Sequence, residues 1–286
     1  MNTESIRHRL VFSICLFTTV LLLLIAAGTY WYFLNTTRKL IFDNSFSMVT
    51  ATAKTVDDKI SEARTLLINV AASAPADLLE NRSSLKSWFD NRPATRTIFN
   101  HSLMILDRSG NLIDSKPSGL VIDAETIRKQ KHFTDAVRTG TAQISEPFLC
   151  ESHQQPIFMI TAPIKGPDGT VKALLAGAID LIEGNAVFSS VHNTRVGKKG
   201  YMYLFSNDRT MILHPDRSRV LKKDVKPGMN IMFDRALEGF EGSGETVNSR
   251  GKKFLVSFKR LDTTGWILAA NYPIEEAYSP INKFRN

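Results

Sequence analysis

The carboxylate of Asp180 lies at the end of one of the most apolar segments of the chain, which makes it a candidate for binding a ligand. Residues 171–180 read VKALLAGAID, a nearly continuous apolar run of the kind found in central strands covered on both faces. A buried carboxylate is unfavourable there unless a partner compensates its charge. That partner is either a bound ligand or a network of the chain's own groups, and both interpretations stay open.

The histidines follow no spacing that is typical of catalysis or metal binding. His101, His153, His192 and His214 have no sequence neighbours that suggest a catalytic triad, although triads assemble in space. The chain contains no His-Glu-x-x-His, no Gly-x-Ser-x-Gly and no phosphate-binding loop ending in Lys-Ser or Lys-Thr. His132 has no second ligand at metal-binding spacing. We therefore predict no enzyme, no metal and no cofactor, with an extracytoplasmic hydrolase as a less favoured alternative.

The net charge of the chain limits the kinds of partner molecule that it can bind. The chain carries 36 Lys and Arg against 28 Asp and Glu, a net charge of +8. These basic residues are scattered in short clusters, which favours a solvated surface near anionic lipid headgroups and excludes a nucleic-acid partner.

The two cysteines, Cys15 in an apolar run and Cys150 far beyond it, cannot pair within one chain. We expect Cys150 to be a small buried apolar residue.

Residues 10–34 form an apolar run without a charge, which we predict to be a transmembrane helix. About 25 residues at about 1.5 Å each reach about 37 Å, enough to cross a hydrocarbon core of about 30 Å. Basic residues precede the run and the aromatic sequence YWYF closes it, so residues 1–9 should be cytoplasmic and the rest exported. A cleaved signal peptide is the alternative, but its apolar region usually spans only about 7–15 residues.

Residues 35–75 should continue as a long stalk helix, because no Gly or Pro interrupts residues 35–73. Apolar residues recur there in alternating steps of four and three over about four heptads, which predicts a seam that packs on a partner. The seam comprises Phe42, Phe46, Val49, Ala53, Val56, Ile60, Ala63, Leu67, Val70 and Ala74. It could pack on the chain's own domains or on a second subunit, and both options stay open. The helix should end near Pro75.

After a second helix expected at residues 83–99, short strands alternate with turns and short helices, one of them a broken helix at 124–138. SLMILDRSGNLIDS (102–115) reads as strand, turn and strand, and YMYLFSNDRTMILH (201–214) repeats it. AGAIDLIEGN (176–185) and AANYPIEEAY (269–278) correspond in the same way. An offset of about 90–100 residues suits a duplicated small domain. We predict an α+β fold with two tandem antiparallel-sheet lobes, residues 76–190 and 191–273, followed by an exit helix at 274–286.

Four segments carry a resemblance to a known family: KHFTDAVRTGTAQISEPF, PIFMITAPIKGPDGTVKALLAGAIDL, GKKGYMYLFSNDRTMILHPD and TTGWILAANYPIEEAYSPI. In this order, and along nearly the whole chain from residue 35, they resemble the double Cache sensor domain of bacterial transmembrane receptors. The resemblance implies a membrane helix, a stalk helix, a membrane-distal and a membrane-proximal PAS-like lobe, and a second membrane helix beyond residue 286.

The resemblance also implies a small-ligand site on the central sheet of the distal lobe. Amino-acid-binding members hold the ligand carboxylate with an Arg-x-Trp-Tyr motif and the amine with an aspartate on the last strand. Asp180 matches that aspartate, but Gln130, His132 and Phe133 stand at the motif positions, so the motif is not met. A small polar or cationic-ended solute is therefore expected rather than an α-amino acid.

Two further positions, Phe148 and Cys150, fall where the family lines its pocket, and Arg128 is a displaced candidate for holding a carboxylate. The expected ligand-binding residues are thus Asp180, Phe133, Phe148, His132, Gln130, Arg128 and Cys150. The expected function is the extracytoplasmic input of a receptor kinase, a diguanylate cyclase or a chemoreceptor in the bacterial inner membrane. We expect a homodimer joined through the stalk helix. The main alternative is a structural, dimer-forming membrane protein without a ligand.

Overall fold

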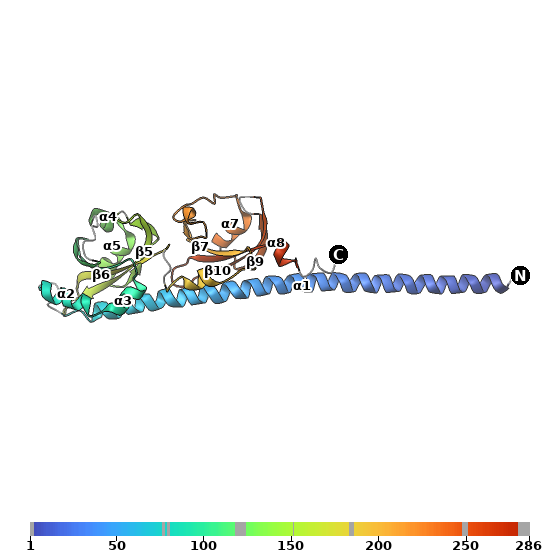
Figure 1. Ribbon diagram of the computed structural model, residues 1–286, viewed down its shortest axis with the longest axis horizontal. Helices are drawn as coiled ribbons and strands as arrows, with labels where there is room; N and C mark the ends of the chain where they lie inside the picture. The colour runs from blue at the N-terminus through green and yellow to red at the C-terminus, as the bar shows by residue number, and fades with distance from the viewer. Residues whose placement is uncertain are drawn as a thin grey trace.

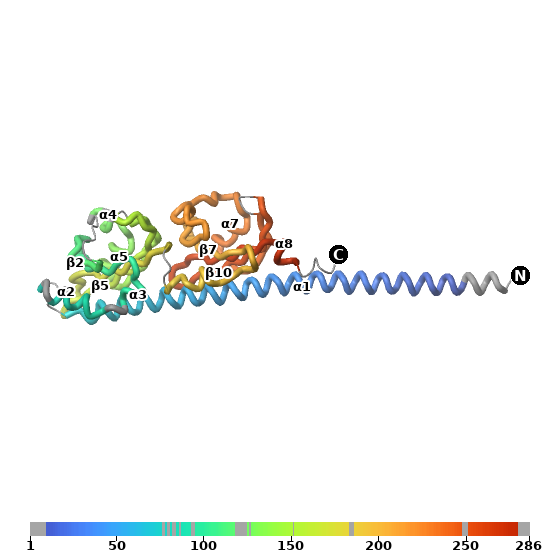
Figure 2. Tube along the Cα trace, viewed as in Figure 1, coloured from blue at the N-terminus to red at the C-terminus, as the bar shows by residue number. Residues whose placement is uncertain are grey.

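A single helix of 70 residues, α1 (Thr3–Ala72), forms the axis of the molecule (Figure 1). The structure is a computed structural model that describes residues 3–75, 78, 81–117, 124–150, 152–182, 186–247 and 251–279. Both sheets lie along the carboxyl-terminal half of α1, and its amino-terminal half extends beyond them without a covering layer (Figures 1 and 2). By length and composition this bare part could cross a membrane, and no side chain described between residues 10 and 34 is buried.

The predicted seam of α1 packs on the chain's own sheets, which is one of the two options that the sequence left open. Its residues from Val49 to Leu67 are at most 2% exposed and join a core with strands of both sheets. Burying one large apolar side chain contributes roughly 1.5–3 kcal/mol, so this seam accounts for much of the attachment of the sheets. The helix ends three residues before Pro75 because proline cannot continue the backbone hydrogen-bond ladder.

The distal lobe, which lies farthest from the amino end of α1, begins with two short helices (Figure 1). These are α2 (Arg82–Asp90) and α3 (Pro93–Ile98), where the sequence predicted one continuous helix. Pro93 explains the division, since proline is favoured in the first turn of a helix and disfavours helical backbone before it. The helices α4 (Ala124–Lys129) and α5 (Lys131–Thr139) form the predicted broken helix, which Gly140 ends with a left-handed φ of 63°.

The described strands of the distal lobe form one antiparallel sheet in the order β2-β1-β6-β5-β3, with β4 also paired to β5. The strands are β1 (Ser102–Asp107), β2 (Leu112–Lys116), β3 (Gln143–Ile144), β4 (Phe148–Cys150), β5 (Gln155–Lys165) and β6 (Val171–Asp180). Alternate residues of β6 point to opposite faces, as the pleat requires. Leu175 and Ile179 join the core with α1, whereas Leu174, Ala176 and Ala178 join a second cluster beneath α5. The central strand is therefore covered on both faces, as predicted.

The proximal lobe repeats this plan nearer to the amino end of α1. After α6 (Ser189–Asn193), its strands are β7 (Tyr201–Phe205), β8 (Met211–Leu213), β9 (Gly242–Val247), β10 (Lys253–Arg260) and β11 (Ile267–Pro273). They pair antiparallel in the order β8-β7-β11-β10-β9, so the last strand lies between the first and the penultimate one in both lobes. A short 3-10 helix, η1 (Arg217–Arg219), and α7 (Ile231–Leu237) lie between β8 and β9. The predicted pair of antiparallel α+β lobes is confirmed.

The chain then enters α8 (Ile274–Ala277), which lies beside α1 at the amino-terminal side of the proximal lobe (Figure 1). Tyr278 Oη donates to Glu245 Oε1 at 2.5 Å, and Arg38 Nη2 on α1 donates to the same oxygen at 2.7 Å. These contacts tie β9, α1 and the exit segment together. The rest of the predicted exit helix, residues 280–286, lies outside the described residues.

Candidate functional site

Asp180 ends β6 on the same face as Ala178, and only 2% of it is exposed. Its Oδ1 accepts a hydrogen bond from the backbone N–H of Ile182 at 2.6 Å. Its own N–H donates to the side-chain oxygen of Asn100 at 3.0 Å. The N–H of Ile182 therefore compensates part of the buried charge, while Asn100 holds the backbone of Asp180 at the end of β6.

His101 immediately precedes β1, and its backbone N–H donates to the carbonyl of Ala178, two residues before Asp180. Its Nδ1 lies 3.1 Å from Ser102 Oγ, while Nε2 is buried without a hydrogen-bond partner in the described part of the chain. Burial, followed by the neighbouring His153, lowers the pKa of His101, and the nearby Asp180 carboxylate raises it in part. The uncharged imidazole is thus favoured beside Asp180.

Cys150 and His153 lie at the connection between β4 and β5, close to that imidazole. The Nδ1 atom of His153 is 3.9 Å from Cys150 Sγ, and the rings of His101 and His153 are nearly perpendicular with centroids 5.1 Å apart. One ligand-type atom from each of the three residues lies within 4.8 Å of the other two. Cys150 is buried, as expected, but its sulfur faces histidines as well as the apolar cluster.

Ring side chains from α5 and β4 form the next part of the site. His132 stacks on Phe148 with centroids 6.4 Å apart and an interplanar angle of 21°, and Phe133 joins the same cluster as Cys150 and Ile157. Burial lowers the pKa of His132 to about 4, so this imidazole is neutral at pH 7. These rings therefore present flat, uncharged surfaces near Asp180, the one carboxylate that is buried among the described residues.

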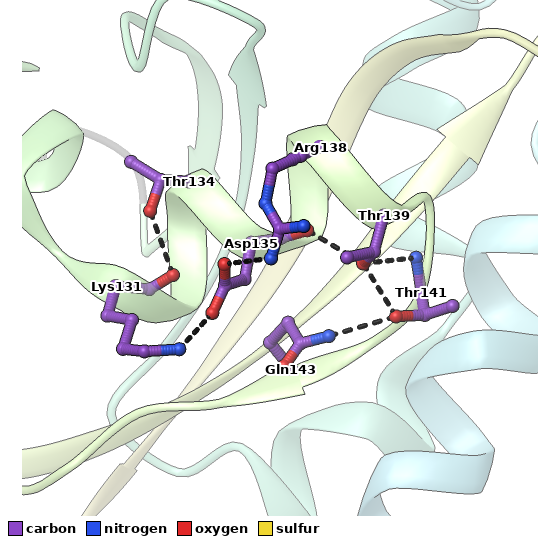
Figure 3. A network of polar contacts seen from close by, with 7 residues as sticks. All are labelled: Lys131, Thr134, Asp135, Arg138, Thr139, Thr141 and Gln143. Atoms are coloured by element: carbon purple, nitrogen blue, oxygen red, sulfur yellow. Dashed lines mark hydrogen bonds and ion pairs between the residues drawn. The ribbon is translucent and has the colours of Figure 1, made fainter.

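A network of polar contacts connects α5 with the segment that follows it (Figure 3), while His132 and Phe133 of the same helix are buried. Asp135 accepts from Lys131 and, at 2.7 Å, from Arg138. Beyond the helix, Thr139 and Thr141 share a hydrogen bond of 2.7 Å, and Gln143 of β3 donates to Thr141 at 2.9 Å. Figure 3 shows these side chains running from α5 to the edge of the sheet. They fix the end of α5 relative to β3.

One of the expected site residues, Arg128, lies elsewhere on the lobe, whereas Gln130 directly precedes α5 and its carbonyl accepts from the N–H of Phe133 at 3.1 Å. Arg128 is exposed on α4, and its charge contributes to Asp107 at the other end of β1. The pKa of Asp107 is lowered because hydrogen bonds from Asn111 and Ser109 and the charge of Arg128 outweigh the effect of burial. Asp107 lies six residues after His101, which at about 3.3 Å per residue along β1 separates the two by about 20 Å. Gln130 is partly exposed between α4 and α5.

The structure therefore brings together Asp180, Cys150, Phe148, His132 and Phe133, and it adds His101 and His153, which the sequence analysis did not assign. His153 stands three residues after Cys150, a local spacing that is visible in the sequence. His101 is brought in only by the pairing of β1 with β6. Because that pairing joins residues about 75 positions apart, no local pattern could have revealed it.

A polar cavity of about 320 Å³ lies in the proximal lobe. Its walls include Lys199, Tyr201, His214, Arg219 and Phe233. Arg219 Nη1 lies 2.9 Å from His214 Nε2, and two further guanidinium nitrogens bind Asp224. Burial and the Arg219 charge lower the pKa of His214 to about 4. This cavity is polar and basic, but its arginine already has a carboxylate partner.

Two tandem antiparallel-sheet lobes carried on one long helix define the class of protein to which the chain belongs, a two-lobed α+β domain on a stalk helix. A family model described as a Cache domain, of the double Cache type, matches residues 35–281. The chain belongs to this Cache domain family, as the resemblance implied.

Curated relatives include the methyl-accepting chemotaxis protein McpG of Pseudomonas putida, which is 20% identical over 173 residues. That match covers 59% of this chain and 26% of the relative. The methyl-accepting chemotaxis protein PctB of Pseudomonas aeruginosa is 20% identical over 161 residues, with 55% and 24% covered. This chain thus matches only about a quarter of the length of these relatives.

Solved structures of similar fold include the ligand-binding domain of the amino acid chemoreceptor PctB in complex with L-arginine. Its TM-score is 0.66 at 21% identity, covering 85% of this chain and 92% of that domain. The ligand-binding domain of the Pseudomonas fluorescens chemoreceptor CtaA in complex with L-isoleucine has a TM-score of 0.64 at 19% identity, with 86% and 98% covered. These likenesses establish the fold.

Proposed function

We propose that this chain is the ligand-sensing input of a membrane-anchored bacterial receptor and that it binds a small solute in the distal lobe. The observation that carries the proposal is the position of Asp180, a carboxylate 2% exposed on the outer face of the sheet. It lies at the edge of the cluster that also contains Cys150 and Phe133. A buried carboxylate beside neutral ring surfaces suits a solute with a cationic or amine end.

The proposed solute is not restricted to α-amino acids. Relatives of the same fold are described in complex with L-arginine and L-isoleucine, which supports an amine-bearing ligand class. Here Gln130, His132 and Phe133 replace the residues that grip the carboxylate in amino-acid-binding members, and Arg128 lies toward Asp107. We therefore favour amines and cationic-ended polar solutes over ligands that require a carboxylate clamp.

The proposed topology places residues 1–9 in the cytoplasm, residues 10–34 in the bacterial inner membrane and the two lobes outside. The bare apolar half of α1 supports this arrangement. The chemotaxis relatives favour a chemoreceptor output over a kinase or a cyclase. The contacts of Arg38, Glu245 and Tyr278 would then couple the proximal lobe to both segments that lead to the membrane.

A thermal-shift screen of small amines and other metabolites on the full chain in detergent tests the solute site. A ligand at a hundred times its dissociation constant stabilises the native state by about 2.7 kcal/mol, which should raise the melting temperature by several degrees. Asp180→Asn should abolish the shift while the protein stays folded, because the amide keeps the shape but loses the charge. Asp168→Asn, in the exposed β5–β6 turn, is the matched control and should bind normally. Normal binding by Asp180→Asn would assign Asp180 to a structural role.

A further inference from the structure

We propose that His101, Cys150 and His153 form a binding site for a divalent transition-metal ion such as Zn²⁺. This site goes beyond the proposed solute sensing and does not depend on it. The three residues come from two places far apart in the sequence, the start of β1 and the β4–β5 connection, and the fold brings them together. Two imidazoles and a thiolate form a donor set that suits zinc and related ions.

The spacing of the three donors is close to what a tetrahedral ion requires. Zinc–nitrogen bonds of about 2.0–2.1 Å and zinc–sulfur bonds of about 2.3 Å place neighbouring ligand atoms about 3.3–3.6 Å apart. Cys150 Sγ and His153 Nδ1 lie 3.9 Å apart, and no pair of the three donors exceeds 4.8 Å. These separations exceed the ideal ones by at most about 1.5 Å, so small movements of the exposed His153 and the β4–β5 connection complete the geometry.

The neighbouring groups favour His101 as a metal ligand. Its Nδ1 lies 3.1 Å from Ser102 Oγ, so a proton on Nδ1 leaves the lone pair of Nε2 free for a metal. That Nε2 is buried and has no hydrogen-bond partner in the described ranges, which is unfavourable for a polar atom unless something binds it. Asp180 contributes a negative charge nearby, which favours a cation at this position.

The site would hold the ion through three protein ligands and keep one position for water or another donor, an arrangement seen in open zinc sites. Binding releases the thiol proton of Cys150 to solvent, because the thiolate is the ligand. An ion here would clamp the β4–β5 connection to the start of β1 and so close one end of the distal-lobe site.

The test uses the full chain in detergent, purified without a polyhistidine tag and with Cys15→Ser to remove the other thiol. Zn²⁺ is titrated against a chromophoric chelator in the absence of any organic solute, so the outcome is independent of the solute-sensing proposal. We expect one ion per chain. His153→Ala, at an exposed position that should not disturb folding, should weaken binding at least tenfold. His192→Ala, an exposed histidine outside the cluster, should bind as tightly as the parent.

Co²⁺ gives a second measurement that reports the sulfur ligand directly. A thiolate-to-cobalt charge-transfer band should appear in the near ultraviolet for the Cys15→Ser parent and vanish in Cys150→Ser. Circular dichroism of each variant checks that the fold is kept. Binding that is substoichiometric, or equally tight in the parent, His153→Ala and Cys150→Ser, would overturn the proposal.

Discussion

The hydroxyl oxygens of Ser45 in α1 and Ser257 in β10 lie 2.7 Å apart inside the contact between the helix and the proximal sheet. Ser257 Oγ is also 2.7 Å from Ser243 Oγ in β9, whose hydroxyl donates to the carbonyl of Phe42 at 2.8 Å. Ser45 is 6% exposed and Ser257 is fully buried, so water does not compete for these bonds. Whereas apolar contacts tolerate sliding, this chain of hydroxyls fixes the axial position of α1 on the sheet.

Removing either hydroxyl should therefore destabilise the proximal lobe. Ser45→Ala and Ser257→Ala should each lower the free energy of unfolding by about 1–2 kcal/mol, because a buried partner loses a hydrogen bond. In a double-mutant cycle followed by urea denaturation, the coupling energy should be about 1 kcal/mol. Thr55→Ala, at an exposed position of the same helix outside the chain of hydroxyls, is the control and should have little effect. Strict additivity of Ser45→Ala and Ser257→Ala would contradict the hydroxyl chain.

Gly177 allows Phe99 to pack against the middle of β6. A Cβ added at Gly177 would lie 2.3 Å from Phe99 Cδ1, and the ring is only 2% exposed, so it cannot move aside without disturbing the core. Gly177→Ala should lower the free energy of unfolding by about 1–3 kcal/mol, the usual range for overpacking. Thermal and chemical denaturation of the full chain in detergent would measure the change.

The Phe99→Leu background separates steric crowding from a general effect on the strand. If the clash with the ring is the cause, Gly177→Ala should be markedly less harmful when Leu replaces Phe99. An equal loss of stability in both backgrounds would mean that the ring is not what restricts residue 177.

His132 should make the stability of the distal lobe depend on pH. Its folded-state pKa is about 4, against about 6.5 for an unperturbed histidine, because the ring is 5% exposed. The stabilisation from the neutral ring is fully present above pH 6.5, is lost as the pH falls toward 4, and amounts to about 3 kcal/mol over that window. For His132→Phe, the unfolding free energy measured between pH 7 and 4 should fall less steeply with falling pH, because unfolding of this variant takes up about one proton fewer. Phe133→Leu, a non-titrating change in the same cluster, should keep the wild-type slope.

Much of the architecture could be predicted because it rests on local patterns. The apolar residues from Val49 to Val70 repeat with helical spacing, and VKALLAGAID has the composition of a central strand. The division between α2 and α3 was not predicted, although Pro93 marks it, because apolar residues such as Trp88 and Phe99 continue on both sides of it.

The site was harder to predict because its geometry depends on pairings between distant strands. Phe148 and Cys150 became candidates only through the family resemblance, whereas Asp180 was also indicated by the apolar run that it ends. The placement of His101 depends on the register of β1 against β6, which pairs Ser102 with Ala178. A single sequence contains no information on that register beyond the hydrophobic alternation of the two strands.

The face of α1 that points away from the lobes carries a second heptad stripe, and we propose it as the dimer contact. Its residues are all exposed and follow steps of four and three: Ser47, Ala51, Lys54, Asp58, Ser61, Thr65, Ile68 and Ala72. Small and polar side chains predominate, so the stripe suits a weak helix pair whose arrangement a ligand can shift. The part of the predicted seam from Val49 to Val70 cannot form the dimer contact, because the chain's own sheets cover it.

Single cysteines in a Cys15→Ser, Cys150→Ser background test this contact in native membranes. Ala51→Cys and Thr65→Cys should form disulfide-linked dimers under mild oxidation, because equivalent residues face each other across a parallel helix pair. Val56→Cys is the matched control on the same helix, and it should not crosslink because it is fully buried against the chain's own core. A differential affinity of tenfold for one helix arrangement corresponds to about 1.4 kcal/mol, enough for a ligand to change the ratio of crosslinking at the two exposed positions. Crosslinking that is absent at both exposed positions, or equally strong at Val56→Cys, would exclude a dimer along this stripe.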